Sequence, residues 1–178
     1  AIIVDPSIET RMRLKQATSS VASFRKTHLV NNLKDARIKL AGRELVDVVF
    51  VAETEGSEAI KEFIQDVKAT PQGADVAFIL VLGKKNQDNV TIASAMLLGP
   101  DGLLFEPYSV EALVEITHVA NRVKKERASA REKKAIQIIV NDLENQLNIA
   151  SQVKAANLDT RSSFRKLKDT AASLKNLS

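Results

Sequence analysis

The chain has 178 residues, of which 44% are hydrophobic and only 4% aromatic, and its formal net charge is +4. The apolar content is sufficient for a packed core and excludes a disordered chain. Scarce aromatic residues argue against a stacking platform for single-stranded nucleic acid, and the absence of cysteine excludes disulfides and thiolate chemistry.

The charge is unevenly distributed along the chain. Residues 1–121 contain 13 lysines and arginines against 16 acidic residues, a net charge of −3, whereas residues 122–178 contain 13 against 6, a net charge of +7. We therefore expect an acidic body at 1–121 and a basic extension at 122–178, which would carry any attraction for a polyanion. No apolar run approaches the ~20 residues that a membrane-spanning helix needs. With no signal peptide visible either, we expect a cytoplasmic protein.

Short apolar runs alternate with amphipathic segments throughout the body. Pro6 is expected to end the first strand, and Ser7 and Ser109 are expected to cap the first and last helices. The predicted strands are 1–4, 21–25, 46–52, 77–82 and 103–105. The predicted helices follow them in turn, beginning at 8, covering 28–40, 57–68 and 90–98, and beginning again at 110.

Five strand–helix units in alternation predict a parallel sheet with helices on both faces, because continuously apolar strands need cover on each side. The expected fold class is α/β: a doubly wound, five-stranded parallel sheet in the flavodoxin-like order 2-1-3-4-5, followed by a helical tail. In such a sheet the functional site lies at the carboxyl ends of the strands. The residues there are Asp5-Pro6, Ala52-Glu53, Leu82-Gly83 and Glu106-Pro107.

The extension at 122–178 shows only helical patterns. Residues 122–134 are dominated by charge and predict a solvated continuation of the fifth helix, and a turn at 157–159 is expected to precede a last helix at 161–177. Between them lies a heptad seam of about two repeats, which predicts a helical hairpin or part of a dimeric bundle. The heptad seam consists of Ile136, Val140, Leu143, Leu147 and Ala150, and the last helix offers Phe164, Leu167, Ala171 and Leu174.

Three segments of the body resemble response-regulator receiver domains (CheY-like), in the correct order and spacing. Residues 3–12 resemble the family's opening strand, acidic pair and first helix, and residues 46–52 resemble the strand that carries the phosphoacceptor aspartate. Residues 99–109, Gly-Pro-Asp-Gly-Leu-Leu-Phe-Glu-Pro-Tyr-Ser, are similar to the last loop, strand and turn, where the family has Lys-Pro-Phe-Ser. The resemblance covers 1–121 and implies a role in bacterial two-component signalling.

The resemblance fails at the residues that carry the family's chemistry. Receivers accept a phosphoryl group from a histidine kinase on an aspartate, assisted by Mg²⁺ on an acidic pair, a hydroxyl group and a lysine. The acidic pair is here Asp5 and Pro6, the acceptor position holds Ala52, the hydroxyl position falls at about Leu82, and the lysine position holds Glu106. Only Asp5 keeps its role, so we predict a pseudo-receiver with no catalytic residue and no cofactor.

The remaining carboxylates leave three alternatives open. Glu53, next to the acceptor position, would be an atypical phosphoacceptor after a shift of register. Asp5, Glu53 and Glu106 would form a cluster for a divalent cation, unless they are three solvated acids at strand ends. A fixed negative charge at Glu53 or Glu106 would imitate a phosphorylated state.

The sequence as a whole predicts a signal-transduction adaptor that is not an enzyme and that acts through protein–protein contacts, as a homodimer. One expected surface is the fourth helix, fifth strand and fifth helix, which receivers commonly use to dimerise, and the other is the heptad seam. The residues expected there are Leu103, Phe105, Tyr108, Val140, Leu143 and Leu147. The alternative is a nucleic-acid-binding regulator whose basic run at 122–134 is the output, although no DNA-reading motif is present.

Overall fold

The computed structural model describes residues 1–21, 23–42, 44–155 and 161–175. The chain divides into two compact units, Ala1–Arg127 and Ala128–Ser178. The first unit extends past the boundary predicted at 121, because Arg127 is hydrogen-bonded to the body as described below.

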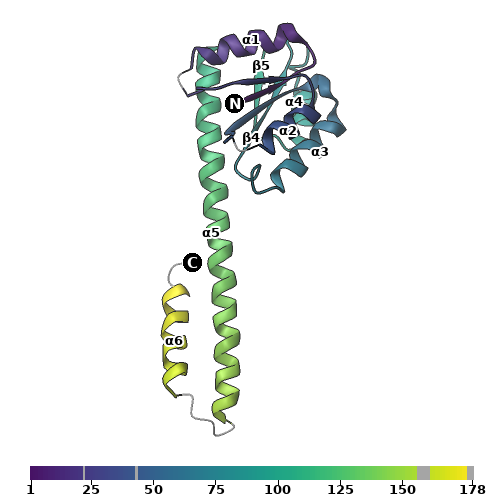
Figure 1. The fold of residues 1–178 in the computed structure, drawn as a ribbon. Coiled ribbons are helices and arrows are strands. Elements are labelled where there is room, and N and C mark those ends of the chain that lie inside the picture. Colours follow the sequence, from purple (N-terminus) through teal and green to yellow (C-terminus); the bar gives the residue numbers. More distant parts are fainter. Residues whose placement is uncertain (22, 43, 156–160, 176–178) are drawn as a thin grey trace. The chain divides into compact units, whose positions relative to one another are not determined.

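A five-stranded parallel sheet in the order β2-β1-β3-β4-β5 forms the centre of the first unit, as predicted (Figure 1). Every residue of β1, β3 and β4 is buried, because helices cover both faces of the sheet. The strands are β1 (Ile2–Val4), β2 (His28–Val30), β3 (Val48–Ala52), β4 (Ala77–Leu82) and β5 (Gly102–Phe105).

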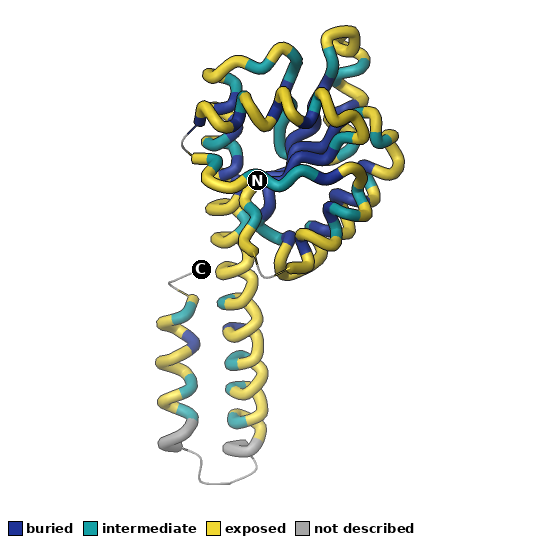
Figure 2. The backbone as a smooth tube through the Cα atoms, turned by 45° about the horizontal axis from the view of Figure 1, so that its top comes forward, coloured by how far each residue is buried: buried dark blue, intermediate teal, exposed yellow. Residues whose placement is uncertain are grey.

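The helices pack on the sheet in two layers, each with its own apolar cluster. Side chains of α2, α3 and α4 belong to one cluster, and side chains of α1 and the first part of α5 belong to the other. Figure 2 shows the buried strands between these layers. The helices are α1 (Ile8–Ser19), α2 (Leu33–Leu40), the short 3-10 helix η1 (Glu53–Glu55), α3 (Ser57–Lys68), α4 (Asn89–Leu97) and α5 (Val110–Ala155).

Local signals placed most elements correctly, including both predicted serine caps. Ser7 Oγ accepts a hydrogen bond from the backbone N–H of Thr10, and Ser109 Oγ accepts one from the N–H of Ala112. The predicted bounds of α3 and β4 agree with the structure at both ends.

The second strand is the one misplaced element of the predicted sheet. It was predicted at 21–25 with a helix at 28–40, but β2 is His28–Val30 and pairs with β1. The helix begins only at Leu33, because the Asn32 side chain accepts the backbone N–H of Asp35 at 2.8 Å and caps it. Leu29 of the strand and Leu33 of the helix are four residues apart, which is also the spacing of apolar residues in a helix. For this reason the prediction included the strand in the helix.

The second unit is a helical hairpin. The remainder of α5 lies beside α6 (Arg161–Lys175) in both views (Figures 1 and 2). Val140 of the heptad seam and Ala171 of α6 are both buried, and an ion pair between Lys175 and Glu144 links the two helices. A hairpin is one of the two arrangements expected for the extension, and the predicted turn at 157–159 lies outside the described residues.

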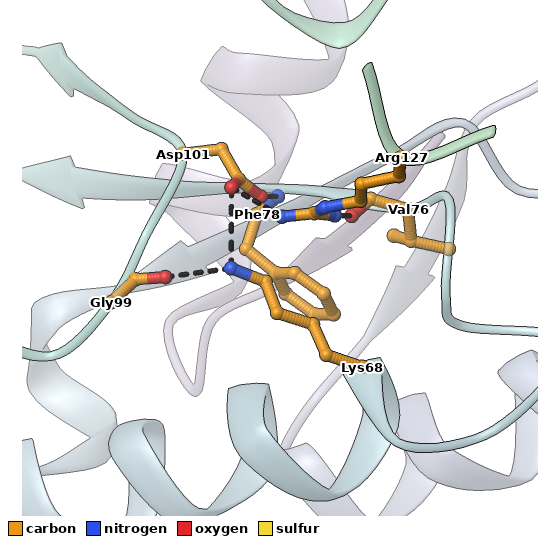
Figure 3. Close-up of polar contacts among 6 residues, drawn as sticks. All are labelled: Lys68, Val76, Phe78, Gly99, Asp101 and Arg127. Carbon is orange, nitrogen blue, oxygen red and sulfur yellow. Dashed lines mark hydrogen bonds and ion pairs between the residues drawn. The ribbon is translucent and has the colours of Figure 1, made fainter. Parts of the chain in front are cut away.

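Asp101, in the loop before β5, joins segments from four parts of the first unit (Figure 3). Its Oδ2 accepts the backbone N–H of Phe78 at 2.9 Å, and its Oδ1 lies 3.2 Å from Lys68 Nζ and 2.5 Å from Arg127 Nη2. Arg127 also donates to the carbonyl of Val76 at 2.6 Å, and Lys68 donates to that of Gly99 at 2.8 Å. One carboxylate therefore fixes α3, β4, β5 and α5 at the amino edge of the sheet.

We expect Asp101→Ala to lower the free energy of unfolding by about 2–3 kcal/mol, because it leaves two half-buried cations and a buried N–H without their acceptor. Asp101→Asn keeps an acceptor for the N–H of Phe78 and loses only the charge, so its loss should be smaller. Urea unfolding of the full chain measures both. An equal loss in the two variants would show that the acceptor retained by asparagine contributes nothing and that the whole effect comes from the lost charge.

Candidate functional site

The strand ends at which the site was predicted lie together at the carboxyl edge of the sheet. The strand register sets Ala52 beside Val81 and Leu82 beside Phe105, so the ends of β3, β4 and β5 lie next to one another. Asp5 follows β1, which pairs with β3. The structure therefore brings together the strand ends that carry the five receiver positions.

Two of these positions are filled by apolar side chains that belong to the core. Ala52 is buried, and Leu82 has only 1% of its surface exposed and packs within the apolar cluster below α3 and α4. Pro6, at a third position, is exposed and has no group that could bind a cation. The edge thus lacks a nucleophile at the acceptor position and a hydroxyl group beside it.

Asp5 organises the start of α1. Its Oδ1 accepts the backbone N–H of Ser7 at 2.7 Å, and its Oδ2 accepts the hydroxyl of Thr10 at 2.5 Å. The guanidinium of Arg11, which is buried, donates to the backbone carbonyl of Asp5. The carboxylate is therefore engaged by donors from its own loop and helix.

Glu53 closes the end of β4. It begins η1 directly after β3, and its Oε1 accepts the backbone N–H of Gly83 at 2.9 Å. A Cβ atom at position 83 would lie 3.2 Å from that same oxygen, so glycine leaves the room that the carboxylate uses. Glu53, the candidate for an atypical phosphoacceptor, therefore accepts a hydrogen bond that links η1 to the residue after β4.

Glu106 is held within the turn that follows β5. Its Oε1 accepts the hydroxyl of Tyr108 at 2.9 Å, and its backbone carbonyl accepts the side-chain amide of Gln87 at 2.8 Å. Burial raises the pKa of Tyr108, and its hydrogen bond to the negative Glu106 raises the pKa further. The phenol therefore stays protonated and remains a donor to Glu106.

These three carboxylates do not form a cation site in the structure. Within the described ranges, no group of three or more His, Asp or Glu side chains is placed so that it could hold a metal ion. Each of the three is instead bound to a separate donor, as described above. The cluster hypothesis thus gains no support from the geometry.

Sequence reasoning did not single out Glu55, the last residue of η1. Its Oε1 is buried without a hydrogen-bond partner among the described residues. Burial raises its pKa, the negative charge of Asp5 raises it further, and a hydrogen bond from the backbone of Leu33 opposes the shift. A second acid three residues beyond the end of β3 was the only signal in the sequence.

A pocket of about 420 Å³ lies at the opposite edge, near the amino ends of β3 and β4. Two of its acidic residues are already paired, Asp47 with Lys124 at 2.9 Å and Glu44 with Lys26 and His28. Its walls include Leu45 and Pro71 as apolar residues. It is separate from the strand ends at which the function was predicted.

The side chains predicted to bind partners are largely packed inside their own units. Leu103, Phe105 and Tyr108 are half-buried against the core clusters. Val140 is buried, and Leu143 and Leu147 are half-buried, in the part of α5 that lies beside α6. The exposed apolar residues on α4 and at the start of α5 are others, namely Val90, Met96, Leu97, Val110 and Val114.

Part of the basic run at 122–134 has structural partners. Lys124 pairs with Asp47, and Arg127 pairs with Asp101. These contacts reduce the positive charge that is free to attract a polyanion. In the described part of the chain, no helix has the length and apolar character needed to cross a membrane.

Several solved structures with a similar fold are response regulators or receiver domains. A putative response regulator from Chloroflexus aurantiacus is similar with a TM-score of 0.57 at 12% identity, over 67% of this chain and 95% of that one. A chemotaxis response regulator of Vibrio cholerae has a TM-score of 0.53 at 17% identity over the same shares. The signal receiver domain of an HD domain-containing protein from Pseudomonas fluorescens has a TM-score of 0.52 at 23% identity, over 74% of this chain and 90% of that one.

At these identities the similarity establishes the fold: a receiver-type, flavodoxin-like sheet with its helices. No protein-family model matches the sequence. No curated protein matches it either.

Glu55 generates a pH-dependent prediction. Folding raises its pKa above the ordinary value of 4.5, so this group stabilises the fold most below pH 4.5 and loses that contribution as pH rises through the raised pKa. At pH 7, Glu55→Gln should therefore be more stable than the parent chain, by less than about 1 kcal/mol because the side chain is partly screened by solvent. At pH 4 the gain should disappear.

Thermal unfolding at both pH values measures the effect. Glu62→Gln, at an exposed position of α3, is the matched control and should show no such gain. A gain in stability of Glu55→Gln that is the same at pH 4 and pH 7 would show that the ionisation of Glu55 is not its cause.

Proposed function

We propose that the first unit is a receiver-type signalling domain that does not accept phosphate and that acts through protein–protein contacts. The observation that carries the proposal is the residue set at the carboxyl edge: Pro6, Ala52, Leu82 and Glu106 stand where phosphoryl transfer needs an acid, a nucleophile, a hydroxyl and a lysine. In this role the chain is a signalling adaptor and not an enzyme.

The electrostatics of the edge support this proposal. A transferred phosphoryl group spreads negative charge over three oxygens, and receivers neutralise it with a cation and a lysine. Here Glu106 places a carboxylate at the lysine position, and Tyr108 holds it there. Asp5 and Glu53 add further negative charge to the same edge, so a bound phosphoryl group would be repelled rather than stabilised.

The packing of the edge supports it as well. Ala52 and Leu82 are part of the apolar core, so a polar replacement at either position would be buried. The carboxylates that remain are engaged by the N–H groups of Ser7 and Gly83 and by a hydroxyl from Tyr108. We interpret the edge as a site whose polar groups now maintain the fold.

The contact surface of this unit lies on α4 and the first turns of α5. Leu97 of α4 has 82% of its surface exposed, and Val90 is exposed on the same helix. Val110 and Val114 are exposed at the start of α5. Exposed apolar side chains on neighbouring elements are typical of a protein-binding surface, and this is the face that receivers commonly use. The helical extension makes the protein a homodimer in this proposal.

Mass spectrometry after incubation with a small-molecule phosphoryl donor and Mg²⁺ tests the proposal. We expect no phosphoryl adduct on the full chain, because the acceptor position has no nucleophile. A gain of one phosphoryl group that disappears in Glu53→Gln would instead assign Glu53 as the acceptor and refute the pseudo-receiver. A receiver with an intact aspartate, treated in parallel, is the positive control.

A further inference from the structure

The part of α5 in the second unit has a second apolar face that α6 does not cover. Ile138 and Ile149 each have 61% of their surface exposed, and Ile139 has 49% exposed. In the heptad seam, by contrast, Val140 is buried and the other four residues are half-buried. Figure 2 shows the buried and half-buried stretches of this part of α5 on its side toward α6. Three exposed isoleucines on one helix are therefore not accounted for by the hairpin.

Two of these isoleucines, Ile138 and Ile149, belong to a second heptad spacing on α5. Ala135, Ile138, Asp142, Asn145 and Ile149 are separated by three, four, three and four residues, and all five are exposed. We call this set the outer seam. With 100° of rotation per residue, the centre of the outer seam lies about 140° around the helix from the centre of the heptad seam. A helix with two seams at this angle is typical of a bundle in which it has two neighbours.

The hairpin alone has little core to support it. Among the described residues of the second unit, only Val140 and Ala171 are buried. The outward face of α6 cannot cover the outer seam of the same chain, because its apolar residues Phe164, Leu167 and Leu174 lie on one stripe together with Ala171. Two helices with so few buried side chains gain stability from a further partner.

We propose that the outer seam binds the outer seam of a second copy of this chain, with the two α5 helices antiparallel. This inference rests on the proposed homodimer and names its surface and direction. The surface differs from the heptad seam, which the sequence suggested and which α6 occupies in the structure. Two hairpins joined in this way form a four-helix bundle.

The order of residues along the outer seam determines the partner and the direction. The last four residues of the outer seam, Ile138, Asp142, Asn145 and Ile149, read nearly the same from both ends. Antiparallel pairing about the point between positions 143 and 144 therefore sets Ile138 against Ile149 of the second copy. The same pairing sets Asp142 against Asn145, a carboxylate acceptor against an amide donor. Such a self-complementary patch is what a twofold dimer requires.

Parallel pairing would be unfavourable for the same residues. It would set Asp142 against Asp142 of the second copy, and like charges that face each other in a seam destabilise it. Within its own helix, Gln146 donates to Asp142 Oδ2 at 2.9 Å, which orients the carboxylate without neutralising it. Polar residues at seam positions are known to fix register and direction at a cost in affinity.

Disulfide cross-linking of the full chain tests the direction, because the sequence contains no cysteine. The two variants are Ile138→Cys and Ile149→Cys. Antiparallel pairing places positions 138 and 149 together but separates two copies of position 138 by about 16 Å along the axis, which no disulfide can span. We expect a cross-link when the two variants are mixed and oxidised, and none when either is oxidised alone.

Light scattering over a range of concentrations tests the surface. The full chain should dimerise reversibly, since the seam offers few apolar side chains, and Ile149→Glu should be a monomer at concentrations at which the parent chain is a dimer. Asn148→Glu, at an exposed position outside the outer seam, is the matched control and should dimerise like the parent. Circular dichroism shows that both variants keep their helices.

The outcomes separate this inference from the proposed function. Cross-linking of either variant with itself, or a dimer that Ile149→Glu leaves intact, would overturn the antiparallel outer seam and leave the homodimer standing. A parent chain that is monomeric at every concentration would overturn the homodimer as well. Neither result bears on the pseudo-receiver, which the phosphoryl-transfer assay tests by itself.

Discussion

Burial of the parallel sheet on both faces is the constraint on which the first unit depends. Because β1, β3 and β4 are buried along their whole length, no polar side chain can lie within them without losing its contact with water. The ionisable groups that adjoin these strands therefore lie at the two edges of the sheet. Asp101 with its two cations occupies the amino edge, and Asp5, Glu53 and Glu106 occupy the carboxyl edge.

The two edges use carboxylates in different ways. At the amino edge, Asp101 gathers Lys68 and Arg127 into one network, in which charge is balanced within the protein. At the carboxyl edge, each carboxylate accepts hydrogen bonds from the loop beside it, and no lysine or arginine side chain pairs with Asp5 or Glu106 among the described contacts. At this edge the carboxylates of Asp5, Glu53 and Glu106 therefore accept hydrogen bonds from the surrounding backbone and side chains.

Helix α5 contributes buried side chains to both units, in two different ways. In the first unit it buries Leu113, Ile116 and Ala120 against the sheet, as a surface helix of an α/β fold does. In the second unit it buries Val140 beside α6 while leaving Ile138 and Ile149 exposed. The first surface is covered by the sheet, whereas Ile138 and Ile149 are exposed, and this exposure is the observation on which the proposed second copy rests.

The sequence by itself determined the strand order and most helix bounds, because these follow from local apolar runs and caps. It also supplied the motif residues on which the proposed pseudo-receiver rests. It misplaced β2, whose three residues become a strand only by pairing with β1. The roles of Asp101 and Glu55, and the distinction between the two seams of α5, were decided only by the tertiary structure. Each depends on contacts between residues far apart in the chain, and no local pattern records such contacts.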